Sequence, residues 1–403
     1  MAFFLLMIVQ DNKMMIYKYA LVLVGSMSLI ACGGSSSSSS GGNNTASSIC
    51  SEIESSGTSC QQVIDNAVAY QDNQLNQFST QLGKLQTDIT AYCSGVAGTS
   101  AATLKQTAQS SWQQAMLTWQ KLELLQFGKI TTNDRNDFYS WPLSKGKTCN
   151  VDANIGLLAN GASFNATPQS RGLTALEYLL FKDAPLASCT NNIPAASDVA
   201  ERCGYAKEAV DSMVTQLQAV QSEADQSVQL QNVFTALFYI YTEAKGEKLQ
   251  KTILPQHSND SFKPDLLEYQ FADLSRAAIE ANLEATAMLF NGTGDQAKGF
   301  YDLLVAVGQE TLANSMKTSL QTAINGAAAS EYSQSWRDIL AATTRNEAPR
   351  CINMTATTDA QSSDIDKICS LDEKIKVFTD DLNGGMSLAL NLEIPSAAES
   401  DGD

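Results

Sequence analysis

The segment 228–241 reads VQLQNVFTALFYIY and decides the fold class of this chain. Its large apolar residues recur at intervals of three and four, which places them on one face of an α-helix. These residues are Val228, Leu230, Val233, Phe234, Leu237, Phe238 and Tyr241. The segment 271–289, FADLSRAAIEANLEATAML, repeats the same spacing. Both segments predict amphipathic helices that bury their apolar face.

The same period extends outward from these two segments over most of the chain. It returns in 61–92, 103–127, 205–225, 299–327 and 366–391. Alternating patterns bounded by hairpin turns, which indicate strands, are scarce. We therefore predict an all-α protein in which the helices pack as bundles.

Two prolines, Pro255 and Pro264, mark a break in the helical pattern. Roughly 350 folded residues exceed one typical core, so we expect two packed bundles that are joined at this break. The predicted parts are an N-terminal bundle at 49–253, a linker at 254–265, a C-terminal bundle at 266–395 and an acidic tail at 396–403.

Residues 1–31 have the features of a signal peptide. Their apolar run at 20–30 is about half the length that spans a bilayer core, and it ends in Leu-Ile-Ala-Cys, the pattern of a lipobox. Cys32 would then be lipidated, and residues 32–48 would form a flexible tether rich in Ser and Gly. The alternative is an ordinary signal peptide with a cysteine there by chance. We predict a lipoprotein of the cell envelope, anchored in the outer membrane and facing the periplasm, because Gly33 rather than Asp follows the cysteine.

The chain is acidic, with 43 Asp and Glu against 26 Lys and Arg and a formal net charge of −17. This charge disfavours nucleic acid and anionic lipid surfaces as partners, since both are polyanions. It suits a weak attraction of cations, although a charged surface commonly serves only for solvation.

Nine cysteines are present, and eight remain after Cys32. An even number in an exported chain without a Cys-x-x-Cys motif predicts stabilising disulfides rather than thiolate metal sites. Nearness in sequence favours Cys50–Cys60, Cys189–Cys203 and Cys351–Cys369, which leaves Cys93–Cys149, although other pairings remain open.

The single histidine, His257, restricts the chemistry. A Ser-His-Asp triad and a histidine-rich zinc site both need imidazoles, and His257 lies among turn residues, where a solvated side chain is expected. We therefore predict that the protein is not an enzyme.

Two blocks are more specific than the helical pattern. The first, at 112–119, reads WQQAMLTW and is followed by Glu123 and by Trp141-Pro142; the second, at 169–181, reads QSRGLTALEYLLF. Together they resemble the imelysin family, whose members are periplasmic or lipid-anchored proteins of two helical bundles, often linked to iron acquisition. The resemblance implies such a fold, with iron or another divalent metal as the cofactor.

The motif of that family is Gly-x-His-x-x-Glu at the start of a helix. Here the same frame gives Gly172, Thr174 and Glu177, with threonine at the histidine position. A Thr/Glu pair on one helix face supplies a single carboxylate. The metal site is then reduced, completed by other carboxylates, or replaced by a site for a different ligand.

The local sequence also suggests how this helix is built. Ser170 is its predicted N-cap, and Gly172 leaves room for the approach of another backbone. Glu177 has leucine neighbours, so it faces the core or, alternatively, the solvent. A buried carboxylate needs a partner. The candidate partners are Arg171, Arg135 and Arg276.

Trp112 and Trp119 stand seven residues apart and are expected to pack in the core. Glu123 lies on their stripe and is a further candidate for the site, while Trp141-Pro142 is expected to form a corner near it. An acidic segment opens the helix that follows the predicted linker and could close a cleft against the motif. Its residues are Glu268, Asp273, Ser275 and Arg276.

We predict a lipid-anchored binding protein of iron or metal acquisition, which holds a metal ion or small ligand between its bundles. The candidate ligand residues are Glu177, Thr174, Glu123 and Arg171. The alternative is an interaction scaffold that has lost metal binding and contacts other envelope proteins. A metallopeptidase is disfavoured, because a zinc peptidase needs about three protein ligands and a general base.

Overall fold

The computed structural model describes residues 9–10, 13–14, 49–51, 53, 59–144, 146–189, 193–224, 226–254, 262–294, 297–343, 351 and 363–399. The chain separates into two compact units, Met1–Gly41 and Gly42–Asp403. In the first unit β1 (Val9–Gln10) pairs antiparallel with β2 (Lys13–Met14), and these are the only strands among the described residues. Cys32, the predicted tether up to residue 48 and His257 lie outside the described residues, so the lipid anchor stays a prediction.

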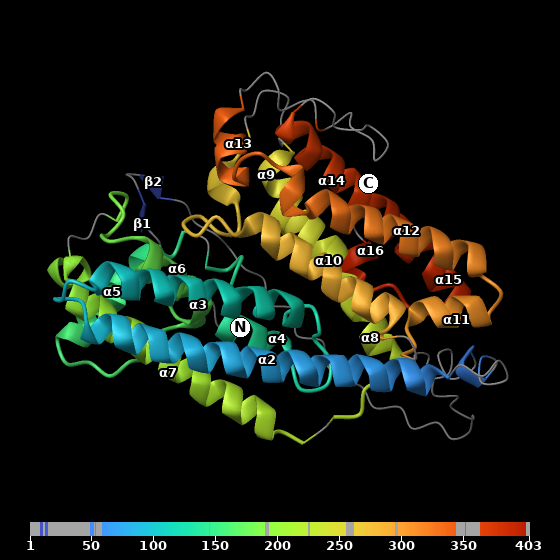
Figure 1. Ribbon diagram of the computed structural model, residues 1–403, viewed down its shortest axis with the longest axis horizontal. Helices are drawn as coiled ribbons and strands as arrows, with labels where there is room; N and C mark the ends of the chain where they lie inside the picture. Colours follow the sequence, from blue (N-terminus) through green and yellow to red (C-terminus); the bar gives the residue numbers. More distant parts are fainter. Residues whose placement is uncertain are drawn as a thin grey trace. The chain divides into compact units, whose positions relative to one another are not determined.

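The second unit is all-α, and its helices form two packed groups (Figure 1). The first group, drawn from blue to green, consists of α2 (Cys60–Ser94), α3 (Ala101–Leu122), α4 (Thr132–Phe138), α5 (Thr148–Ala159), α6 (Gly172–Phe181) and α7 (Val199–Ser222). In it, α2 packs against α3 and α7, and α6 contacts both α3 and α7.

The second group, drawn from yellow to red, follows in sequence. It consists of α8 (Leu230–Leu237), the π-helix η4 (Ile240–Gln250), α9 (Lys251–Ile253), α10 (Ser275–Asn291), α11 (Phe300–Ala306), α12 (Glu310–Ala327), α13 (Trp336–Ala342), α14 (Asp364–Asp381), the π-turn η8 (Leu382–Met386), α15 (Ser387–Leu390) and α16 (Ser396–Glu399). Short 3-10 turns are η2 (Pro168–Ser170), η3 (Pro194–Ser197), η5 (Pro264–Leu266) and η6 (Ala329–Glu331).

The two groups meet where α3 packs against α10 and α2 contacts α8. The helices α8 and η4 precede the predicted linker at 254–265, yet they pack with the second group, against α10 and α14. Most of that segment, 255–261, lies outside the described residues, so the linker stays a prediction. No helix among the described residues has both the length and the apolar composition that crossing a membrane requires.

Capping and burial explain why the long helices form where the sequence predicts them. Ser59 caps α2 in a reciprocal capping box with Gln62, and the buried stripe of the helix includes Phe78, Leu82 and Leu85. Those apolar residues recur at helical spacing and supply the core between α2 and its neighbours.

Several predicted helices differ from the observed ones in their bounds or continuity. The helix expected at 299–327 is two helices, α11 and α12, because Gly308 between them has a φ of +78°, a conformation that ends a helix. The helix expected at 103–127 ends at Leu122. The pattern at 228–241 continues beyond α8 as the π-helix η4, which extends to Gln250.

Four disulfides join the described residues. The predicted pairs Cys50–Cys60 and Cys351–Cys369 are confirmed, whereas the other two predictions are wrong. The observed bonds are Cys93–Cys203 and Cys149–Cys189. The end of α2 lies beside the start of α7, so the packing of the helices, rather than nearness in sequence, decides these pairs.

Candidate functional site

The motif helix α6 begins at a glycine that no other residue replaces easily. Gly172 has a φ of +76°, and a Cβ there would lie 2.6 Å from the carbonyl oxygen of Phe138. The end of α4 therefore approaches the start of α6 as closely as the sequence suggests. Trp112 fixes the same turn from α3, because its Nε1 donates to the carbonyl oxygen of Leu173 at 2.9 Å.

Ser170 does not cap this helix, contrary to the prediction. The N-cap residue is Arg171, which makes no capping hydrogen bond through its side chain. Ser170 belongs to the preceding turn η2, and its hydroxyl accepts a hydrogen bond from Asn154 Nδ2 at 3.0 Å. The bend at Gly172 turns the chain before Ser170 can reach the first N–H groups of α6.

Thr174 and Glu177 share one face of α6 and line a small pocket of about 40 Å³. That volume holds an ion or one or two water molecules. The other lining residues come from the segment after α4, from the start of α5 and from the segment before α10. They are Trp141, Ser144, Gly146, Thr148, Glu268, Gln270 and Phe271.

Glu177 is buried, with 5% of its surface exposed. Its Oε1 accepts hydrogen bonds from the backbone N–H groups of Phe271 at 2.9 Å and Ala272 at 3.0 Å. Burial raises the pKa of Glu177 to about 7, although the two backbone N–H groups favour the carboxylate. The side chain therefore gains or loses its charge near neutral pH.

None of the three predicted arginine partners binds Glu177. Arg171 instead forms an ion pair with Asp137 of α4, and Arg276 pairs with Glu280 one turn further along α10. Arg135 also points elsewhere, toward other carboxylates. The backbone of the 271–272 segment replaces these side chains as the partner of Glu177.

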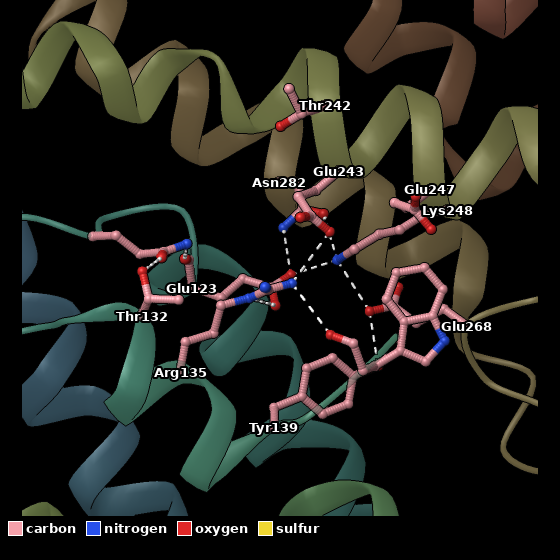
Figure 2. Close-up of polar contacts among 12 residues, drawn as sticks. Glu123, Thr132, Arg135, Tyr139, Thr242, Glu243, Glu247, Lys248, Glu268 and Asn282 are labelled. Atoms are coloured by element: carbon pink, nitrogen blue, oxygen red, sulfur yellow. Dashed lines mark hydrogen bonds and ion pairs between the residues drawn. The ribbon is translucent and has the colours of Figure 1, made fainter. Parts of the chain in front are cut away.

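A second polar cluster surrounds the side chain of Lys248, on η4 (Figure 2). Its Nζ forms an ion pair with Glu123 Oε1 and lies 3.0 Å from Glu268 Oε1, 2.6 Å from Gln120 Oε1 and 3.0 Å from Asn282 Oδ1. We call these four acceptors the oxygen cage. All five residues are buried, so the cluster is a part of the interior.

Glu268 belongs to both the oxygen cage and the pocket. It lies between η5 and α10 rather than on the helix that the sequence predicts, since α10 begins at Ser275. Its Oε1 also accepts a hydrogen bond from Tyr139 at 2.8 Å, while its Oε2 is buried without a hydrogen-bond partner. Burial raises the pKa of Glu268 even though the Lys248 ammonium opposes the shift.

The aromatic block behaves as the sequence suggests. Trp112 and Trp119 are fully buried, and Glu123, on the same stripe, is buried as well. Trp141 lines the pocket and precedes Pro142 in a cis peptide bond, at the corner expected there. Glu123 Oε2 lies 3.9 Å from Arg135 Nε.

Sequence reasoning missed Lys248, Gln120 and Asn282. Lys248 stands in a segment that alternates acidic and basic residues from Glu243 onward, a composition typical of an exposed helix. One feature of the sequence indicates a buried position: Lys248 lies seven residues after Tyr241, a spacing that continues the apolar stripe of 228–241.

The pocket offers oxygen donors: the carboxylates of Glu177 and Glu268 and the hydroxyl of Thr174. Among the described residues, Thr174 Oγ1 is buried without a hydrogen-bond partner, as is Glu268 Oε2. Such donors fit a hard cation that prefers oxygen, and they do not fit a zinc site built of nitrogen and sulfur. No group of three or more His, Cys, Asp or Glu in the described part of the chain can hold a metal ion. A cation held here would therefore keep water as part of its ligand shell.

Comparisons with known proteins bear on the family and the fold of the chain. The model of a peptidase family, M75, described as Imelysin, matches residues 72–364, and no curated protein matches the chain. A crystal structure described as an iron-regulated protein A precursor, from Parabacteroides distasonis ATCC 8503, is similar with a TM-score of 0.52 and 13% identity, covering 81% of this chain and 96% of that one. An imelysin-like protein from Psychrobacter arcticum 273-4 is 16% identical, covers 84% of this chain and 98% of its own, and has a TM-score of 0.48. Because the family model spans well over half of the chain, the protein belongs to the imelysin family.

Proposed function

We propose that the protein is a lipid-anchored binding protein of the cell envelope that takes part in the acquisition of iron or another hard metal. Its ligand site would be the pocket at Thr174, Glu177 and Glu268. The observation that carries the proposal is the pair of buried oxygens without hydrogen-bond partners in residues that line this pocket, Thr174 Oγ1 and Glu268 Oε2. Buried polar atoms are rarely left unpaired unless a ligand or water completes them.

The chemistry of the lining residues supports a cation as the ligand. A bound cation would supply positive charge to two carboxylates that burial otherwise penalises. Glu177 would give its carboxylate above its pKa of about 7, where most of it is ionised. Thr174 would add a neutral oxygen, and Trp141 would exclude bulk water from one side.

A binding role is favoured over peptidase activity, although the family carries a peptidase name. The chain has a single histidine, His257. A zinc peptidase needs about three protein ligands and a general base, most often including two or more imidazoles. The proposal therefore assigns no catalytic residue.

One observation favours a second candidate, an interaction scaffold that has lost metal binding. The Lys248 ammonium lies between Glu123 and Glu268 and supplies a cation of the chain's own beside the pocket. Glu268 is then partly neutralised without a metal ion, which weakens its attraction for one.

Titration calorimetry on the processed protein distinguishes the two candidates. We expect saturable binding of Mn²⁺, Fe³⁺ or Ca²⁺, lost in Glu177→Ala and kept in the control Glu208→Ala, whose carboxylate is exposed on α7. Binding that survives in Glu177→Ala would place the ligand elsewhere. Absence of binding for every metal, together with a co-purifying envelope protein, would favour the scaffold.

A further inference from the structure

The oxygen cage draws its acceptors from three separate parts of the chain. Gln120 and Glu123 come from the end of α3, Glu268 from the segment before α10, and Asn282 from α10 itself. The Lys248 ammonium enters from η4 and lies within 3.0 Å of all four acceptor oxygens. Carboxylate and amide oxygens are ligands that suit hard cations, and the cation that they surround here is a monovalent ammonium group.

The cage is held in place without the lysine. Asn282 Nδ2 donates to the carbonyl oxygen of Gln120 at 2.6 Å, and Gln120 Nε2 donates to the hydroxyl of Tyr269 at 2.7 Å. Tyr139 donates to Glu268 Oε1 at 2.8 Å. These hydrogen bonds orient three of the four acceptors through partners other than Lys248.

The helix that carries Lys248 is a π-helix, a rare form that often accompanies functional sites. Its wide turns place the ammonium 5.5 Å from the centre of the Tyr239 ring, which adds a cation–π contact to the oxygen ligands. With 1% of the residue exposed, water does not compete for the charge.

We propose that the oxygen cage is a monovalent-cation site that the chain fills with its own side chain. Lys248 is a tethered cation, and it joins α3 of the first helix group to η4 and α10 of the second. An ammonium group and K⁺ are of similar size, so a variant without the tether would take up a free alkylammonium ion or K⁺ in the same place. The proposal does not depend on a ligand in the Thr174 pocket.

The test is chemical rescue of the variant Lys248→Ala. Compared with lysine, the alanine side chain lacks the heavy atoms of one n-propylammonium ion. The variant therefore leaves two buried carboxylates without the Lys248 ammonium as their counter-ion. We expect its melting temperature to lie roughly 5 °C below that of the wild type, because breaking a buried pair is strongly destabilising. Unfolding and refolding in n-propylammonium chloride, and separately in KCl, should restore most of the loss, whereas n-propanol and choline chloride should not.

Two variants serve as controls. Lys248→Met also removes the charge but fills the space with an apolar chain, so it should be destabilised and should not respond to n-propylammonium. Lys251→Ala removes an exposed lysine that lies just after the π-helix and pairs with Glu247. This variant should melt like the wild type under every condition.

Either of two results would overturn the proposal. One is a Lys248→Ala protein that melts at the wild-type temperature, which would show that the cage needs no cation. The other is a destabilised Lys248→Ala protein that responds to n-propylammonium and K⁺ no more than Lys248→Met does. Because melting is followed without any metal in the pocket, neither result depends on the proposed metal-binding function.

Discussion

The pocket and the oxygen cage adjoin at Glu268, but they treat their buried charges in opposite ways. In the cage both carboxylates, Glu123 and Glu268, have the Lys248 ammonium at hydrogen-bonding distance. In the pocket Glu177 has no ion pair among the described residues, and the hydroxyl of Thr174 has no hydrogen-bond partner. The chain thus supplies a cation to the carboxylates of one cluster and none to Glu177, which is typical of a ligand site beside its structural support.

The largest effect is expected from a change within the cage. Glu123→Gln removes a buried carboxylate that pairs with Lys248, so the free energy of unfolding should fall by about 3 kcal/mol. Glu284→Gln is the matched control, because Glu284 pairs with Lys121 at 2.7 Å while both side chains are partly exposed. That variant should lose less than about 1 kcal/mol. Equal losses in urea unfolding would show that the cage is no more than an ordinary pair.

A change at the edge of the pocket should have the next largest effect. Gly172→Ala places a Cβ against the carbonyl oxygen of Phe138 at a positive φ, and we expect a loss of about 2–3 kcal/mol. Gly204→Ala is the control, since nothing lies within 4 Å of its Cβ on α7, and it should stabilise the protein by roughly 0.5 kcal/mol. Denaturant midpoints measure both, and a neutral Gly172→Ala would contradict the close approach of α4 and α6.

When the wild type is compared with Glu177→Gln, the pH dependence of stability should report the titration of Glu177. Its folded-state pKa of about 7 lies above the ordinary value of 4.5, so the folded protein binds a proton that the unfolded chain releases. The loss of folding stability that comes from ionising the buried Glu177 is absent below pH 4.5 and grows until the pH passes 7. The free energy of unfolding of Glu177→Gln, taken relative to that of the wild type, should therefore rise by about 2 kcal/mol from pH 5 to pH 8.

Chemical unfolding of Glu177→Gln at these two pH values, with Glu208→Gln as the exposed control, measures this difference. Parallel curves for wild type and Glu177→Gln would mean that the carboxylate is already ionised well below pH 7. The sign is specific to a carboxyl group whose pKa is raised, because a carboxyl group whose pKa is lowered on folding would give the opposite slope.

The smallest effect is expected for the hydroxyl without a partner. Thr174→Val replaces Oγ1 by a methyl group and should change the free energy of unfolding by less than about 0.5 kcal/mol. Thr252→Val is the matched control, because Thr252 is buried and donates to the carbonyl oxygen of Leu249 at 2.6 Å. It should cost about 1 kcal/mol. A large loss for Thr174→Val would reveal a structural role for the hydroxyl that the pocket does not explain.

Most of the fold follows from apolar spacing, and the errors have local causes. The stripe of α2 predicts its bounds to within two residues, since the capping box at Ser59 and the cap at Gly95 end the helix close to its buried stripe. Gly308 breaks a stripe that otherwise continues, and periodicity alone does not register one residue with a positive φ. The bounds of the predicted linker stay a prediction from the sequence, because residues 255–261 lie outside the described residues.

The candidate site was predictable only where a motif marks it. Thr174 and Glu177 are three residues apart, so helix geometry alone brings them to one face. Glu268 lies 91 residues after Glu177 in the sequence, and Lys248 lies 71 residues after it. Only the fold brings them near the motif, and no local pattern encodes such distances. The arginines named as partners of Glu177 carry the right charge, but the directions of α4, α6 and α10 take them to other carboxylates.

The disulfides have a consequence for how the protein is made. The Cys149–Cys189 bond lies inside the segment that Cys93–Cys203 closes. In a chain that emerges with its N-terminus first, Cys50 and Cys60 can form their native bond early. Cys149 is then offered to Cys93 long before Cys203 arrives, so the next available bond is a wrong one. Reaching the native set then requires exchange of that bond by attack of a free thiolate. Production of correctly paired protein should therefore depend on a disulfide isomerase, and an oxidant alone should trap a chain in which α7 cannot dock on the end of α2.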